Sequence, residues 1–132
     1  MLEGKKIALI GAGVMAEVMA LGMVRSKLVD PGDLIVSHYR QERLDEFVKV
    51  VPVETTLVNA EAYAASDIAV LCVRPQAMGG VLDQLRPIAD ADTLLMTIAA
   101  GLSTSFYESR LDGPVPFVRV MPTFFGRIKA GT

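Results

Sequence analysis

Cysteine and histidine are almost missing from this 132-residue sequence, which contains only Cys72 and His38. A single cysteine excludes a disulfide within the chain, and one histidine beside it is too few for an ordinary zinc site. The sequence also shows no carboxylate pair, Cys–His couple or Ser–His–Asp set of the kinds that act as acids, bases or nucleophiles. We therefore predict no metal site and assign no catalytic residue.

An excess of one charge and a long apolar run are missing as well. Thirteen basic and fifteen acidic residues are interspersed, so the net charge of −2 offers no basic surface for nucleic acid or for an anionic membrane. No apolar run reaches the roughly 18 residues of a membrane-spanning helix. The first residues lack a secretory signal pattern, because two lysines precede only a few apolar residues. These absences predict a cytoplasmic protein that binds neither nucleic acid nor membrane.

Apolar residues are abundant and fall in short segments. They make up 52% of the chain, which indicates a well-covered α/β core and not a disordered segment. A chain of this length is expected to form one domain, here residues 1–132, and it contains no repeat, low-complexity tract or linker.

Strand-like and helix-like segments alternate along the sequence. Short continuous apolar runs predict buried parallel strands, and apolar residues spaced i, i+3, i+4, i+7 predict helices. In the first helix the apolar face is expected to run through Val14, Val18 and Leu21, widened by three methionines. Ser105 with Glu108 is expected to cap the last helix. The predicted strands are 7–10, 34–37, a short one near 53, 68–73, 94–98 and 115–120, and the predicted helices are 15–26, 41–48, 59–64, one that begins at 75, and 105–111.

The six predicted strands with their intervening helices indicate a Rossmann-type α/β fold. This is a doubly wound parallel sheet in the order 3-2-1-4-5-6, with helices on both faces. Right-handed crossovers then place the carboxyl ends of the first and fourth strands side by side. Ligands of such sheets bind at this switch point, so we expect the binding site there.

The most informative segment follows the first strand, where an apolar run ends in G-x-G-x-x-A at Gly11, Gly13 and Ala16. In a dinucleotide-binding turn the first glycine permits a sharp bend, and the second lets backbone amides approach a pyrophosphate. A small third residue lets the helix pack against the strand. The free N–H groups and positive end of that helix hold the anion. Because a strand precedes the pattern and a helix follows it, we predict a dinucleotide site and not a merely structural glycine turn.

The end of the second strand bears on which dinucleotide binds. A site for NAD usually has an acidic residue there for the ribose 2′-hydroxyl, whereas this chain has Ser37, His38, Tyr39 and Arg40. Hydroxyl, imidazole and guanidinium groups suit a 2′-phosphate, and the nearest acid, Glu42, lies within the following helix. The pattern therefore favours NADP over NAD. In the other interpretation Arg40 is a solvated residue at a helix start and His38 an incidental surface histidine; for His38 alone we prefer that interpretation.

Two further segments are expected on the same edge of the sheet. Val73, Arg74 and Pro75 follow the fourth strand, where their backbone groups suit the nicotinamide ribose. Ala99 and Ala100 follow the fifth strand, where small side chains leave room for the nicotinamide ring. Taken without the glycine motif, both segments are better explained as ordinary turns.

Four segments, G-A-G-x-M-A from Gly11, then Val73–Gln76, Ile98–Gly101 and Val118–Pro122, resemble the N-terminal half of the pyrroline-5-carboxylate reductase family. The resemblance runs from 6 to 131 and implies a role in proline biosynthesis, by hydride transfer from NADPH or NADH to a cyclic imine acid. The cofactor contacts that it implies are Gly11, Ala12, Gly13, Val14 and Met15 for the pyrophosphate, Ser37, His38, Tyr39 and Arg40 for the adenosine ribose, Asn59 for the adenosine, and Val73, Arg74, Pro75, Ala99 and Ala100 for the second ribose and the nicotinamide.

Three positions depart from that family's pattern. The family usually has asparagine at Val14, lysine at Arg74, and Asn-Thr-Pro where this chain has Thr123-Phe124-Phe125. The last change lies close to the expected site of hydride transfer and alters the pocket there. A divergent paralogue therefore fits as well as an enzyme of proline synthesis.

The family's helical C-terminal domain, which forms the dimer and much of the substrate pocket, is expected to lie outside this chain. The chain is then either a truncated fragment or a free-standing cofactor domain. The resemblance implies that it binds cofactor without turnover and allows a homodimer. Two alternatives stay open: a non-catalytic nucleotide-binding or regulatory module, and a structural interaction domain with an empty site.

Overall fold

Strands and helices alternate along the chain, and the computed structural model describes residues 4–111 and 113–120. The strands are β1 (Ile7–Ile10), β2 (Leu34–Ser37), β3 (Glu54–Thr56), β4 (Ile68–Leu71), β5 (Leu94–Thr97) and β6 (Phe117–Arg119). The helices are α1 (Val14–Arg25), α2 (Gln41–Val50), α3 (Asn59–Ala64), α4 (Pro75–Leu85) and α5 (Thr104–Arg110), with a short 3-10 turn, η1 (Pro31–Asp33), before β2. Every predicted element is present, although β4 and β6 are shorter than predicted. No helix among the described residues combines the length and the apolar character that crossing a membrane requires.

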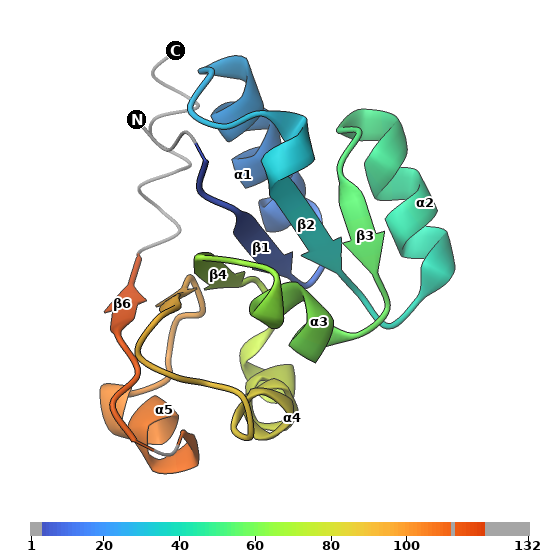
Figure 1. Cartoon of the computed structure of the whole chain (residues 1–132). Helices are drawn as coiled ribbons and strands as arrows, with labels where there is room; N and C mark the ends of the chain where they lie inside the picture. Colours follow the sequence, from blue (N-terminus) through green and yellow to red (C-terminus); the bar gives the residue numbers. More distant parts are fainter. Residues whose placement is uncertain (1–3, 112, 121–132) are drawn as a thin grey trace.

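The six strands of the described chain form one parallel sheet in the order β3-β2-β1-β4-β5-β6, which confirms the predicted topology (Figure 1). β1 lies between β2 and β4, and its last residue, Ile10, pairs with Ser37 on one side and Leu71 on the other. The three strands therefore end at the same level. The loops that follow them start from one edge of the sheet, and β1 and β4 meet at the switch point.

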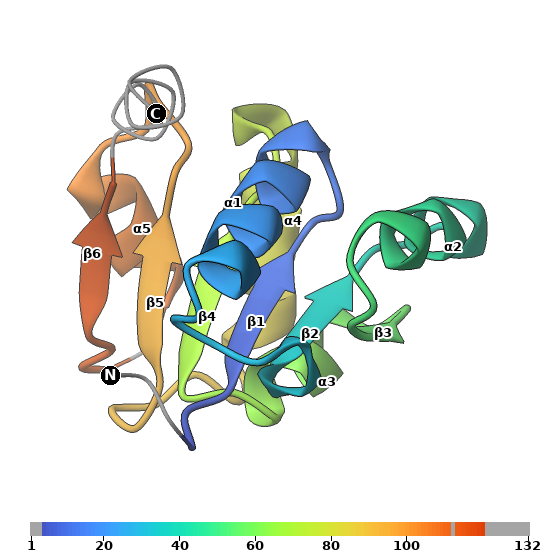
Figure 2. The same cartoon turned by 90° about the horizontal axis from the view of Figure 1, so that it is seen from above.

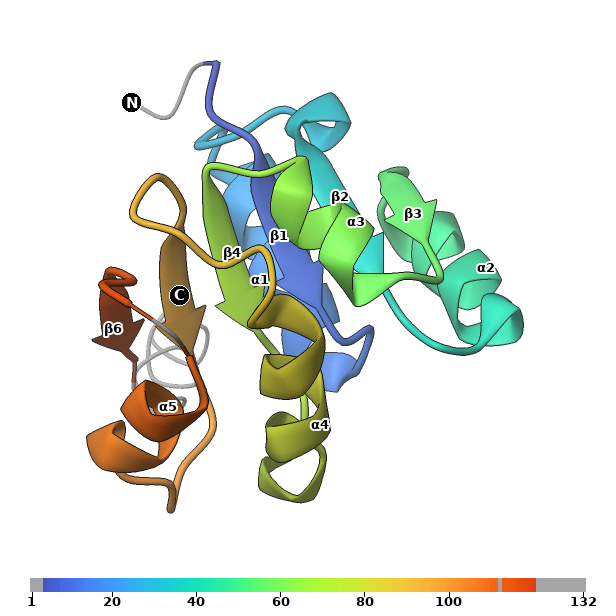
Figure 3. The same cartoon turned by 60° about the horizontal axis from the view of Figure 1, so that its bottom comes forward.

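Helices cover both faces of the sheet, because successive side chains of a strand point to opposite faces. On one face Leu9 packs with Phe47 and other residues of α1 and α2. On the other face Ile10 packs with Leu82 and Tyr107 among residues of α3, α4 and α5. Figure 3 shows α3, α4 and α5 in front of the sheet, and Figure 2 shows α1 on the side away from α4. The inner strands are thus buried on both faces, which explains their continuous apolar runs.

The buried face of α1 differs from the predicted one. Val14 is 76% exposed, whereas Ala16, Met19 and Ala20 are buried against the sheet. Almost every residue of α1 is apolar, so spacing alone cannot distinguish its faces. The small side chains of Ala16 and Ala20 decide the packing, since they let the helix approach β1 closely.

The cap of α5 is also a different residue from the predicted one. Ser103 precedes the helix, and its hydroxyl oxygen accepts a hydrogen bond from the Phe106 N–H at 3.2 Å. Ser105 lies inside the first turn, with its hydroxyl 3.0 Å from that of Ser103. The Ser105–Glu108 pattern matched the sequence form of a capping box, but the helix begins two residues too early for it.

Candidate dinucleotide-binding site

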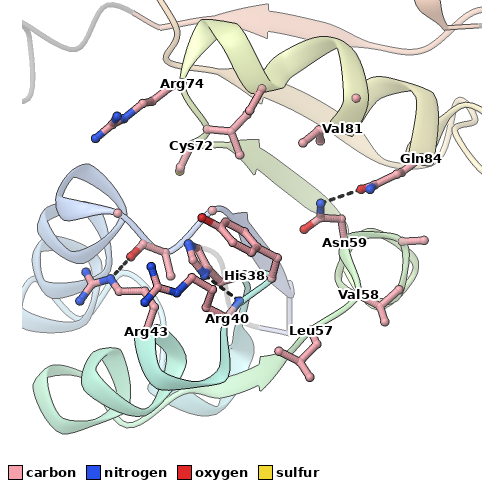
Figure 4. A pocket seen from close by; sticks show the side chains of 18 of the residues that line it. His38, Arg40, Arg43, Leu57, Val58, Asn59, Cys72, Arg74, Val81 and Gln84 are labelled. Carbon is pink, nitrogen blue, oxygen red and sulfur yellow. Dashed lines mark hydrogen bonds between the residues drawn. The ribbon is translucent and has the colours of Figure 1, made fainter.

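A cleft of about 1220 Å³ opens at the carboxyl edge of the sheet (Figure 4). Its walls come from the β1–α1 loop, the β2–α2 loop with the start of α2, the β3–α3 loop, and the β4–α4 loop with the body of α4. The volume exceeds the roughly 300–1,000 Å³ of most small-ligand sites, as an elongated dinucleotide requires. The predicted site residues that line this cleft are Gly11, Ala12, Gly13, His38, Tyr39, Arg40, Asn59, Val73 and Arg74.

Only glycine fits the first position of the glycine motif. Gly11 has a φ of +107°, and its N–H donates to the Ser37 carbonyl at 2.9 Å, which ties the turn to the end of β2. A Cβ at Gly11 would lie 3.0 Å from Val73 Cγ1 and 3.1 Å from the carbonyl carbon and oxygen of Cys72. Both the backbone conformation and the close approach of the β4–α4 loop therefore require glycine.

At Gly13 neither the backbone conformation nor a neighbouring atom of the described chain requires glycine. Its backbone is extended, with a φ of −85°, and a Cβ there would meet no atom of the described chain within 4 Å. Gly13 directly precedes α1 and offers no side chain to cap the free N–H groups of the first turn. Those donors and the positive end of the helix suit an anion. The missing side chain at Gly13 matches the close approach of a phosphate.

His38 and Tyr39 form a stacked pair at the end of β2, with ring centroids 4.5 Å apart and planes at 22°. The Arg40 backbone N–H donates to His38 Nδ1 at 3.0 Å. Burial is the main cause that lowers the pKa of His38 below its ordinary value of 6.5, so the imidazole is neutral at physiological pH. Because Nδ1 accepts a hydrogen bond, the proton of the neutral ring is on Nε2. His38 is therefore a neutral donor at the cleft and not a cation.

The Arg40 guanidinium is the exposed charge at the same end of β2. Its Nε lies 3.2 Å from Glu42 Oε2, and the two side chains are 60% and 74% exposed. An ion pair this exposed holds its partners weakly. Arg40 can therefore exchange Glu42 for an anionic ligand at little cost.

Arg43, in the first turn of α2, lines the cleft and was missed by the sequence reasoning. Its guanidinium donates to the Ala12 carbonyl oxygen and pairs with Glu17 and Glu46. Figure 4 labels Arg43 among the residues that line the cleft. A signal was present, because Arg43 follows Arg40 by three residues and lies in the first turn of the helix that Arg40 precedes.

A chain of hydrogen bonds runs from β2 to α4 along the wall of the cleft. The Ser37 hydroxyl donates to Asn59 Oδ1 at 2.8 Å, and Asn59 Nδ2 donates to Gln84 Oε1 at 2.7 Å. Ser37 is fully buried and does not line the cleft, contrary to its predicted place beside the adenosine ribose. Its β-strand position points the side chain into the structure, where it orients Asn59. Gln84, which sequence reasoning missed, lies 25 residues from Asn59 and gave no local signal.

The end of β4 supplies the opposite wall. Val73 and Arg74 line the cleft there together with Cys72, and Pro75 begins α4 outside the lining. Cys72 is only partly exposed there, and desolvation raises the pKa of its thiol to about 12, so little reactive thiolate forms near neutral pH.

Several predicted contacts lie outside the cleft lining. Val14 and Met15 belong to α1, where Met15 packs against the core. Ala99 and Ala100 follow β5, beyond the part of the edge that the cleft covers. The motif residues 121–125 lie outside the described residues. In the part that the structure describes, no three or more His, Cys, Asp or Glu residues gather as a metal site would require.

The fold and the cleft define a nicotinamide-dinucleotide-binding Rossmann domain of the kind that oxidoreductases use. Residues 6–101 match the family described as "NADP oxidoreductase coenzyme F420-dependent", and the chain belongs to this family.

The relatives of the chain include pyrroline-5-carboxylate reductases. It is 34% identical over 126 residues to that of Pseudomonas aeruginosa and 32% identical over 121 residues to that of Methanosarcina acetivorans. These matches cover 96% and 92% of this chain but 46% and 45% of the relatives. The chain therefore spans less than half the length of the curated relatives it matches.

Solved structures agree with these relatives. A pyrroline-5-carboxylate reductase from Coxiella burnetii has a TM-score of 0.81 at 28% identity, over 87% of this chain and 43% of that one. The Plasmodium falciparum pyrroline carboxylate reductase with NADP bound has the same fold, with a TM-score of 0.78 at 24% identity, over 90% and 42%. The comparisons confirm the predicted fold class and the predicted resemblance to this reductase family.

Proposed function

We propose that this chain is the cofactor-binding domain of a pyrroline-5-carboxylate reductase-like oxidoreductase, which transfers a hydride from NADPH to a cyclic imine. The observation that carries the proposal is the cleft at the carboxyl edge, where the glycine turn at Gly11 lies beside the end of β2 that carries Arg40. The pyrroline-5-carboxylate reductases among the relatives supply the reaction class.

The charges that line the cleft support NADPH over NADH. Arg40, Arg43 and Arg74 line it together with two carboxylates, Glu42 and Glu46. Both carboxylates are paired with arginines, at 3.2 Å and 3.3 Å. No acidic residue occupies the end of β2 itself, where one would bind a 2′-hydroxyl and repel a 2′-phosphate. The lack of an acid at this position, with Arg40 beside it, favours the 2′-phosphate of NADPH.

The residues of the chain bind and orient the cofactor. When bound, the reduced nicotinamide supplies the hydride. The N–H groups at the start of α1 hold the pyrophosphate, and Arg40 holds the 2′-phosphate. Val73 and Arg74 lie against the second ribose, and the small Ala99 and Ala100 leave room for the nicotinamide. We assign no proton donor, because an imine substrate can arrive protonated and orientation beside the cofactor does much of the catalysis.

Isothermal titration of the 132-residue chain with NADPH and with NADH tests the cofactor assignment. Arg40→Ala is expected to weaken NADPH by about tenfold or more, the effect of losing a charge-assisted hydrogen bond, while NADH affinity stays nearly unchanged. Arg86→Ala is the matched control. Arg86 forms an ion pair with Asp83 at 2.6 Å, and neither residue lines the cleft. Equal losses for both cofactors, or none, would contradict the 2′-phosphate assignment.

Two further results would contradict the proposed function as a whole or in part. If the wild-type chain binds neither NADPH nor NADH, the cofactor role fails and a structural interaction domain is the better reading. We also propose that the chain alone binds cofactor without turnover. NADPH oxidation by this chain in the presence of pyrroline-5-carboxylate would refute that claim.

A further inference from the structure

Arg43 joins α2 to the glycine-rich turn and to α1. Its Nε–H donates to the Ala12 carbonyl oxygen, Nη2 pairs with Glu17, and Nη1 lies 3.3 Å from Glu46. The guanidinium carbon is 6.0 Å from the centre of the Phe47 ring. The Arg43 side chain is 23% exposed and is held on several sides at once. This set of contacts fixes its position far more firmly than that of Arg40.

The bond to Ala12 determines how the glycine turn presents its amides. The described peptide bonds are all trans, and in a trans peptide the C=O and the N–H point in opposite directions. By holding the Ala12 carbonyl, Arg43 also fixes the direction of the Gly13 N–H. Without this bond the peptide can rotate cheaply, because glycine accepts a wide range of backbone angles. A rotation would turn a carbonyl oxygen toward the space where the N–H has to meet a phosphate.

The ion pair between Arg43 and Glu17 affects the charge at the start of α1, next to the glycine turn. Glu17 lies in the first turn of α1, and its side chain is 23% exposed. A carboxylate there suits an empty helix N-terminus but repels a second anion bound to it. Arg43 neutralises this carboxylate. The arginine therefore removes a repulsion that the pyrophosphate would otherwise meet.

We propose that Arg43 is a positioning residue of the cofactor site, which fixes the Ala12–Gly13 peptide and neutralises Glu17 so that α1 can bind a pyrophosphate. The proposal rests on the proposed function of the cleft. Arg43 supports binding of the pyrophosphate, which NADPH and NADH share. Arg40 is assigned to the 2′-phosphate, which only NADPH carries.

Titration of Arg43→Gln, Glu17→Gln and the double variant with NADPH and with NADH tests this inference. Arg43→Gln is expected to weaken both cofactors by a similar factor of about ten, since a charge-assisted hydrogen bond is lost. Glu17→Gln alone is expected to tighten both cofactors by about twofold, because the carboxylate beside the anion site is gone while Arg43 keeps its bond to Ala12. The double variant is expected to recover part of the loss, because the unpaired carboxylate is gone. Arg86→Gln, outside the cleft lining, controls for the loss of an arginine.

Two outcomes would overturn the assignment. A loss confined to NADPH would make Arg43 a direct ligand of the 2′-phosphate. Unchanged affinities together with a lower melting temperature would make its role structural only. Arg43→Lys serves if the glutamine variant does not fold, because lysine keeps the charge but cannot donate to Ala12 and Glu17 in the same fork. It too should weaken both cofactors.

The wild-type titration separates this inference from the proposed function. If the wild type binds neither cofactor, the proposed function fails and the role of Arg43 fails with it. If the wild type binds and the Arg43 variants bind equally well, only the role of Arg43 is refuted.

Discussion

Replacing Gly11 by alanine is expected to destabilise the whole sheet, because the change strikes the backbone at the junction of β1, β2 and β4. The φ of +107° is strained for a residue with a side chain, at a cost of about 1–3 kcal/mol. The new Cβ would also press against the Cys72 carbonyl at 3.1 Å and Val73 Cγ1 at 3.0 Å, and overpacking of this kind costs about 1–3 kcal/mol. The sum, roughly 2–6 kcal/mol, is a large share of the roughly 5–15 kcal/mol by which domains are stable.

Thermal unfolding followed by circular dichroism measures this effect. The melting temperature of Gly11→Ala should fall by roughly 10 °C or more, since about 1 kcal/mol corresponds to a few degrees in a chain of this size. Gly13→Ala is the matched control, because its φ is −85° and its Cβ would meet open space. A weaker helix cap and a less flexible unfolded chain nearly cancel there, so its stability should change by less than about 1 kcal/mol. The steric reasoning is wrong if Gly11→Ala has the melting temperature of the wild type. It is also wrong if Gly13→Ala lowers the melting temperature as much as Gly11→Ala does.

Two other residues give predictions that are simple to check. With the pKa of its thiol raised to about 12 by burial, Cys72 has about one thiolate in 10⁴ molecules at pH 8. Alkylation by iodoacetamide is therefore expected to be slow at pH 8 and to accelerate about tenfold per pH unit up to pH 10; rapid labelling at pH 8 would contradict the burial. Ser103→Ala should lower the free energy of unfolding in urea by about 1 kcal/mol, because it removes the cap of α5. Ser105→Ala should change it by less than about 0.5 kcal/mol, and equal effects would show that Ser103 is not the cap.

The order of the strands could be predicted because each strand is a short apolar run and each connection carries a helix. Parallel strands joined by right-handed crossovers leave few arrangements, and the glycine motif after Ile10 fixed which strand lies at the centre. Boundaries and faces were less predictable. In α1 nearly all residues are apolar, so only the packing shows that Ala16 is buried and Val14 exposed. The α5 cap was predicted wrongly because only Ser105, with Glu108, matches a capping box, whereas the actual cap, Ser103, is followed three residues later by Phe106.

The candidate site was predictable where the backbone itself carries the signal. Gly11 and Gly13 stand out by their spacing directly after an apolar run. The apolar run that forms β2 likewise shows where that strand ends. Side chains that reach the cleft from helices were not predictable in the same way. Arg43 and Gln84 line the cleft only because α2 and α4 pack at particular angles to the sheet.

By itself, the sequence of this protein determined the alternation of strands and helices, the glycine turn after β1 and the lack of an acid at the end of β2. Those features depend on residues close together in the chain, where backbone angles and apolar spacing decide the outcome. The tertiary structure alone decided that Gly11 must leave room for Cys72, that Ser37 orients Asn59 instead of facing the cleft, and that Arg43 holds the turn. Each of these contacts joins residues 22 to 61 positions apart, so its distance and direction exist only after the sheet and helices have packed together.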